Sequence, residues 1–253
     1  MGIGENIGCN IGENTGSSGA LIVDDEPPPG VLAEVTANFQ AFSLGQVVTG
    51  TDGFSLAGTQ SVADNTRSTT GTQSCKGTLS AGSNGQAQWG GYFNQAPLLP
   101  VSVGETLTYQ LDMWIDSAWD WKTGSKGPFR IQLKNSVGSS YGYFDLICDE
   151  GGGGVNRIRP EFSVGLPTVD TALFSLGQWI TVKTEIVLSN VVGEGSWKVW
   201  YDDSLEYDAS SGYRTCFNAT DQITGIHCFA FFNEDTPDSD QYMWFDNFKI
   251  TRS

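Results

Sequence analysis

The chain has 253 residues, which suits one large β domain, because β-sandwiches of roughly 200–250 residues are routinely single domains. Acidic residues outnumber basic ones 29 to 13 and give a formal net charge of −16, so the surface repels phosphate and nucleic-acid binding is excluded. No apolar run approaches the roughly 18 residues of a membrane span, and no basic and apolar leader follows Met1, so we expect neither a membrane segment nor a signal peptide.

The N-terminal segment is a Gly-rich repeat. Residues 3–14 contain three copies of a four-residue unit, Ile-Gly-Glu-Asn or Ile-Gly-Cys-Asn. In an extended chain the isoleucines project from one side and bury nothing by themselves. We therefore expect an arm that docks on another surface, the alternative being a Gly-rich leader without a partner; its candidate contact residues are Ile3, Ile7, Cys9 and Ile11. A stiff proline spacer ends this segment, so the sequence predicts an arm and linker over residues 1–30 and one domain over residues 31–253.

From Val31 onward the pattern is one of strands separated by Gly, Asp and Ser turns. Apolar residues alternate cleanly from Thr106 to Ile115, and Phe129, Ile131 and Leu133 form the apolar face of the next strand. Asp202-Asp203 is typical of a hairpin turn. No convincing helix longer than two turns is found, so the sequence predicts an all-β sandwich or jelly roll. Further strands are predicted at residues 141–148, 178–188, 196–201, 223–232 and 242–251.

Several aromatic segments, taken in order, resemble a known family. The segments are Gln88-Trp89-Gly90-Gly91-Tyr92-Phe93, Trp119-Asp120-Trp121, Gly177-Gln178-Trp179, Trp197 to Asp203 and Met243 to Ile250. Over residues 39–253 this order resembles the concanavalin A-like jelly rolls related to polysaccharide lyases of the alginate and glucuronan type. The resemblance implies a jelly-roll sandwich of two antiparallel sheets. The same fold also occurs in glycan-binding domains and in virion proteins of tailed phages, so it does not decide catalysis.

In lyases of this fold, the resemblance implies an Arg and a Gln or Asn that bind the uronate carboxylate, with His and Tyr as base and acid. The residues of this chain that fit those roles are Arg130, Gln132, His227 and Tyr143, with Tyr141 as a second phenol. The usual segments Arg-x-Glu-Leu, Gln-Ile-His and Tyr-Phe-Lys-Ala-Gly are absent, and Gln132-Leu133-Lys134 stands where Gln-x-His is expected. The alternatives therefore stay open: solvated or ion-paired strand charges, and a structural histidine.

Glycan binding without catalysis needs aromatic platforms and a few polar groups. The candidates are Arg130, Lys134, Trp119 and Trp121, and the alternative for each Trp is core or edge packing.

Two other residue groups have side chains that can bind a metal ion or form a disulfide. The acidic loop 234–240 offers Asp235, Asp238 and Asp240 as a weak Ca²⁺ site, with a solvated turn as the favoured interpretation, so no cofactor is expected. Five cysteines without a Cys-x-x-Cys pair favour reduced thiols, and a Cys216–Cys228 disulfide stays open.

The sequence favours a non-enzymatic virion structural protein, of the capsid decoration (cement) or fibre type, made in the host cytoplasm and displayed on the virion surface. Residues 1–30 would dock on other virion or assembly proteins, giving an oligomeric or assembly-bound chain, while the jelly roll contacts glycans. One alternative is a polysaccharide lyase that cleaves a uronate polymer by β-elimination. A second is a secreted glycan-binding module.

Overall fold

The computed structural model describes most of the chain from Gly30 onward. The described residues are 30–48, 54–56, 61–82, 89–93, 96–119, 128–135, 137–148, 158–162, 166, 171–230 and 236–253. The predicted arm residues Ile3, Ile7, Cys9 and Ile11, together with Trp121 and Asp235, lie outside these ranges.

The described residues form fifteen strands and no helix, which confirms the all-β prediction. Consequently none of them belongs to a helix long and apolar enough to span a membrane. The strands are β1 (Ala33–Ala37), β2 (Phe54–Leu56), β3 (Ser61–Asp64), β4 (Ser74–Leu79), β5 (Trp89–Phe93), β6 (Val101–Ser102), β7 (Thr106–Ile115), β8 (Pro128–Lys134), β9 (Ser140–Cys148), β10 (Ile158–Phe162), β11 (Trp179–Val187), β12 (Ser196–Tyr201), β13 (Ser204–Ala209), β14 (Gln222–Ala230) and β15 (Gln241–Arg252).

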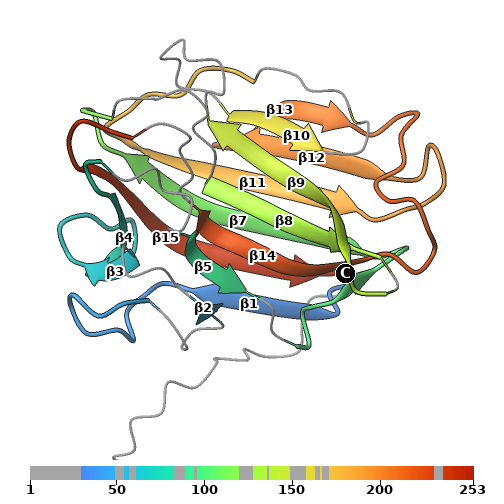
Figure 1. Ribbon diagram of the computed structural model, residues 1–253, viewed down its shortest axis with the longest axis horizontal. Coiled ribbons are helices and arrows are strands. Elements are labelled where there is room, and N and C mark those ends of the chain that lie inside the picture. The colour runs from blue at the N-terminus through green and yellow to red at the C-terminus, as the bar shows by residue number, and fades with distance from the viewer. Residues whose placement is uncertain are drawn as a thin grey trace, which may run out of the picture.

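The strands pair antiparallel in two sheets that pack face to face, as the jelly-roll prediction requires. The eight-stranded sheet, named sheet A, has the order β13-β12-β11-β7-β15-β4-β3, with β1 also paired to β15. The seven-stranded sheet, named sheet B, has the order β10-β9-β8-β14-β5-β2, with β6 also paired to β14. In Figure 1 the strands β9, β8 and β14 of sheet B lie in front of β11, β7 and β15 of sheet A.

The strands with the clearest alternation of apolar residues in the sequence are found where they were predicted. β7 and β12 have the predicted bounds, and in β7 Leu107, Tyr109 and Leu111 are completely buried. Asp202 and Asp203 join β12 to β13 with φ angles of 44° and 69°, the left-handed pair that a two-residue hairpin turn requires. Local sequence therefore determines both the strand face and the turn.

Aromatic side chains connect the two sheets through the core. The rings of Phe144 in sheet B and Trp197 in sheet A meet edge to face, with centroids 5.2 Å apart. Trp197 is 1% exposed, and its Nε1–H donates to Thr184 Oγ1 at 2.7 Å, so burial of the indole leaves no unpaired donor.

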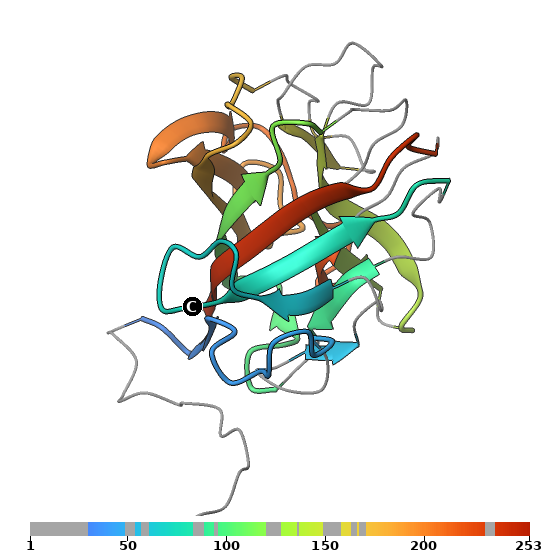
Figure 2. The same cartoon turned by 90° about the vertical axis from the view of Figure 1, so that its left-hand side faces the viewer.

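The last strand, β15, contains one extra residue relative to β7. Asp246 pairs with Asp112 and Lys249 with Gln110, so Asn247 and Phe248 oppose a single residue of β7. Asn247 has a φ of 50°, a left-handed conformation that asparagine tolerates better than most residues. In Figure 2 the red β15 runs beside the cyan β4, with which its first half pairs, whereas its second half pairs with β1.

A buried carboxylate holds the segment before β4 against this bulge. Asp246 is 0% exposed and accepts hydrogen bonds from the backbone N–H groups of Thr69 at 2.8 Å, Thr70 at 3.0 Å and Asn247 at 2.9 Å. Three donors to one buried carboxylate satisfy its charge without a cationic partner.

We expect Asp246→Ala to lower the free energy of unfolding by about 3 kcal/mol, because three backbone donors lose their acceptor inside the protein. Urea denaturation followed by tryptophan fluorescence measures the change. Glu194→Ala, an exposed carboxylate of the β11–β12 connection, is the matched control and should change stability by less than about 0.5 kcal/mol. Equal stability of the two variants would contradict the structural role of Asp246.

Cys216 is a buried free thiol, which settles the Cys216–Cys228 alternative against a disulfide. Burial raises the pKa of this thiol from 9.0 to about 12; the negative charge of Asp221 adds to the increase, and Arg214 opposes it. The thiolate is therefore strongly disfavoured in the folded protein.

Cys216 should resist iodoacetamide in the native protein at pH 9 and react once the chain is unfolded. Because its pKa is raised by folding, the stability that Cys216 contributes is complete below the unfolded value of 9.0 and declines as the pH rises toward 12. Peptide mass spectrometry after brief alkylation of native and urea-unfolded protein measures the difference. Native labelling as rapid as that of the unfolded chain would show this environment to be wrong.

Candidate functional site

The outer face of sheet B, the face that points away from sheet A, carries the polar residues singled out from the sequence. In β8, Ile131 and Leu133 are buried, while Arg130, Gln132 and Lys134 alternate with them and are partly exposed. In β9 the same alternation buries Phe144 and Leu146 and leaves Tyr143 and Asp145 partly exposed. The period-two pattern of both strands thus places these five polar side chains on one face.

Strand register arranges this face in rows. Arg130 of β8 pairs with Asp145 of β9 on one side and with His227 of β14 on the other, and His227 in turn pairs with Tyr92 of β5. Residues directly opposite each other in antiparallel strands occupy the same face, with Cβ atoms about 5 Å apart. His227 and Tyr92 are placed here by backbone register alone.

The next rows contain the remaining candidates on β8. Gln132 pairs with Tyr143 in β9 and with Gly225 in β14. After a register shift between Leu133 and Lys134, Lys134 pairs with Ser140 and with Gln222. Gly225, which is buried, contributes no side chain beside Gln132.

Arg130 is held rigidly by its neighbours. Its Nε and Nη2 atoms donate to the two carboxylate oxygens of Asp145 at 2.8 and 2.7 Å, a bidentate pair. Its guanidinium also lies over the ring of Tyr143, 4.4 Å from the ring centroid. The side chains of Arg130 and Asp145 are 24% and 14% exposed, so the pair is only partly screened by solvent. The arrangement orients the guanidinium and places a carboxylate beside it.

The structure brings together Arg130, Gln132, Lys134 and Tyr143, and strand register adds the position of His227. Trp119, in contrast, follows β7 of sheet A and is only 7% exposed. Trp121 lies outside the described residues.

The described part of the acidic loop makes protein contacts. Asp240 accepts a hydrogen bond from the backbone N–H of Ala81 at 2.9 Å, and Asp238 is exposed. Within the described ranges no group of three or more His, Cys, Asp or Glu residues is placed to hold a metal ion.

Sequence reasoning missed Asp145 and Tyr92. The local pattern was sufficient to predict the position of Asp145. Polar Tyr143 and Asp145 alternate in β9 with apolar Phe144 and Leu146, so they lie on the same outer face. Tyr92 belongs to an aromatic motif whose local pattern says nothing of its partner strand. Its alignment with His227 depends on pairing between strands more than 130 positions apart in the chain.

Comparisons with known proteins find similarity in structure and not in sequence. No protein-family model matches the chain. No curated protein matches it either.

Several solved lyase structures share the fold over most of both chains. A mutant of alginate lyase Aly36B in complex with alginate tetrasaccharide has a TM-score of 0.62 at 15% identity, with 86% of this chain and 96% of that chain covered. The alginate lyase vAL-1 from Chlorella virus has a TM-score of 0.58 at 13% identity, covering 88% and 100%. The endo-β-1,4-glucuronan lyase from the fungus Trichoderma reesei has a TM-score of 0.57 at 13% identity, covering 87% and 95%. At these identities the likeness shows the concanavalin A-like jelly-roll fold, which confirms that expectation, and leaves the activity to be argued from the site.

Proposed function

We propose that the outer face of sheet B binds a uronate-containing polysaccharide and cleaves it by β-elimination. The observation that carries this proposal is the alignment of His227 with Arg130 and of Gln132 with Tyr143 in two neighbouring rows. These rows contain the residue types that the reaction needs: groups that bind a carboxylate, a base and an acid. The fold shared with alginate and glucuronan lyases supports the same class of reaction.

Each residue takes one task. Arg130 and Gln132 bind the uronate carboxylate and stabilise the charge that develops when the neighbouring proton leaves. His227 removes the proton from C5, and the electron pair of that C–H bond is delocalised into the carboxylate held by Arg130 and Gln132. The pair then forms the C4=C5 double bond as the glycosidic C4–O bond breaks, and Tyr143 donates its hydroxyl proton to the leaving oxygen. Lys134 contacts the polymer next to the reacting sugar.

Tyr143→Phe should lower the rate of elimination by about 10²- to 10⁴-fold, because the leaving oxygen loses its proton donor. The ultraviolet absorbance of the unsaturated uronate product measures the rate on polymannuronate, polyguluronate and glucuronan.

Tyr242→Phe is the matched control for this variant. Tyr242 lies in β15 of sheet A, outside the candidate site, so its loss of a hydroxyl should leave the rate unchanged. If the wild-type protein produces no unsaturated product from any of the three polymers, the lyase function is excluded.

A second candidate is a non-enzymatic virion structural protein, a capsid decoration or fibre-type component displayed on the virion surface, whose jelly roll contacts glycans. The observation in its favour is the Arg130–Asp145 pair, since a guanidinium already bound by a carboxylate attracts an acidic sugar less strongly. The formal net charge of −16 also disfavours the binding of an acidic polysaccharide. In this role residues 1–30 dock on other assembly proteins, and the chain is made in the host cytoplasm.

Deletion of residues 1–19 tests the docking role. The shortened chain should keep its melting temperature and its far-ultraviolet circular dichroism, because the fifteen strands begin at Ala33, but should lose higher-order assembly. Size exclusion with light scattering compares its mass with that of the full chain. Assembly of the shortened chain to the same mass would contradict a docking role for the repeats.

A further inference from the structure

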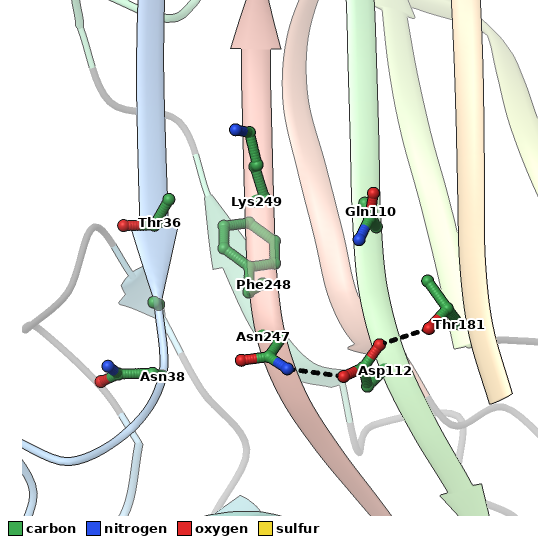
Figure 3. A pocket seen from close by; sticks show the side chains of 9 residues that line it. Thr36, Asn38, Gln110, Asp112, Thr181, Asn247, Phe248 and Lys249 are labelled. Carbon is green, nitrogen blue, oxygen red and sulfur yellow. Dashed lines mark hydrogen bonds between the residues drawn. The ribbon is translucent and has the colours of Figure 1, made fainter. Parts of the chain in front are cut away.

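A polar hollow of about 450 Å³ lies on the outer face of sheet A, the face of the sandwich opposite the candidate lyase site. It forms where β15 changes partner from β4 to β1, beside the bulge at Asn247. Figure 3 shows side chains from four strands around it: Thr36 from β1, Asn247 and Lys249 from β15, Gln110 and Asp112 from β7, and Thr181 from β11.

The carboxylate of Asp112 lies in the wall of this hollow and is only 8% exposed. Its Oδ2 atom accepts hydrogen bonds from Asn247 Nδ2 at 2.6 Å and Thr69 Oγ1 at 2.8 Å, whereas Oδ1 accepts one, from Thr181 Oγ1 at 2.7 Å. A carboxylate offers about four acceptor sites. Oδ1 therefore retains the capacity to accept a hydrogen bond from a ligand.

The remaining wall presents amide and hydroxyl groups. Across the described part of the chain, neither the side-chain amide of Gln110 nor the hydroxyl of Thr36 makes an intramolecular hydrogen bond, so both are available to a ligand. The ammonium of Lys249 is 3.0 Å from a carboxylate oxygen of Glu34 and is compensated by it. Lys183 of β11 lies opposite Gln110, and its ammonium is over the Trp200 ring, 4.7 Å from the centroid. The residues that line the hollow thus offer donors and acceptors, and the cation among them, Lys249, is paired.

Two indoles adjoin the hollow. Trp114 and Trp179 pair across β7 and β11, two residues along their strands from Asp112 and Thr181, a displacement of about 7 Å. Both are partly exposed, and their rings meet edge to face at a centroid distance of 5.9 Å. The guanidinium of Arg67 lies over the Trp114 ring, 4.8 Å from its centroid, and is 3.7 Å from Asp116, so Trp179 is the indole that offers ring surface to a ligand. Partly exposed indoles next to amide, hydroxyl and carboxylate groups suit a ligand with an apolar C–H surface and many hydroxyls.

We propose that this hollow and its indoles form a second, non-catalytic binding site for a neutral saccharide. Ligand hydroxyls donate to Asp112 Oδ1 and exchange hydrogen bonds with Gln110, and a sugar ring packs on Trp179. Asp112 disfavours an acidic sugar, because Lys249 is already paired and two carboxylates in a partly buried hollow repel each other. This site thus selects neutral sugars, whereas the outer face of sheet B, which carries Arg130, is proposed to select acidic ones.

The test is calorimetric titration of the full chain with neutral cello-, xylo- and manno-oligosaccharides and with oligomannuronate. At least one neutral series should bind, and oligomannuronate should not bind at this site. Gln110→Leu, which keeps the side-chain volume and removes the amide, should weaken neutral binding by about tenfold. Trp179→Ala should weaken it as well, by loss of the ring surface.

Thr108→Val is the matched control, because Thr108 lies on the same face of β7 and does not line the hollow. Binding that survives Gln110→Leu, binding abolished by Tyr143→Phe instead, or the absence of binding to every neutral series would each overturn the proposal. A loss of uronate cleavage in Tyr143→Phe with unchanged neutral binding would keep the two sites separate, so either proposal can fail without the other.

Discussion

The extra residue in β15 determines which side chains of the last strand enter the core. Before the bulge Met243 and Phe245 face inward, and after it Phe248 and Ile250 do, with exposed fractions of at most 3%. In an uninterrupted strand the inward positions would continue to Asn247 and Lys249, and burial of an amide and an ammonium without partners costs several kcal/mol. One additional residue shifts the parity and keeps four apolar side chains in the core.

The same bulge shapes the outer face of sheet A. At the bulge, the Asp246 carboxylate points toward the segment before β4 and accepts hydrogen bonds from its backbone N–H groups. At the same place the partner strand of β15 changes from β4 to β1. Asp112 of β7 pairs with Asp246 at this point, and together with Asn247 and Lys249 it lines the hollow. Structural stabilisation of the last strand and the formation of a polar hollow are therefore two results of one irregularity in pairing.

A feature of the fold can be predicted from the sequence when residues close together in the chain determine it. The β7 and β12 bounds, the Asp202-Asp203 turn and the shared face of Arg130, Gln132 and Lys134 follow from patterns within about ten residues. The bulge has a local signal as well, since apolar residues of the last strand change parity between Phe245 and Phe248.

The rows of the candidate site, in contrast, depend on pairing between distant strands. The alignment of His227 with Arg130 joins positions nearly one hundred residues apart, and the Arg130–Asp145 contact depends on the register of β8 with β9. The alternation of residues along a strand predicts which face of the sheet a side chain lies on. It does not predict which residue of the adjacent strand lies beside it. The neighbour determines the chemistry: Asp145 makes Arg130 half of an oriented ion pair. In the function that we propose, an acidic sugar is therefore recognised by directed hydrogen bonds from Arg130 and Gln132 more than by net positive charge.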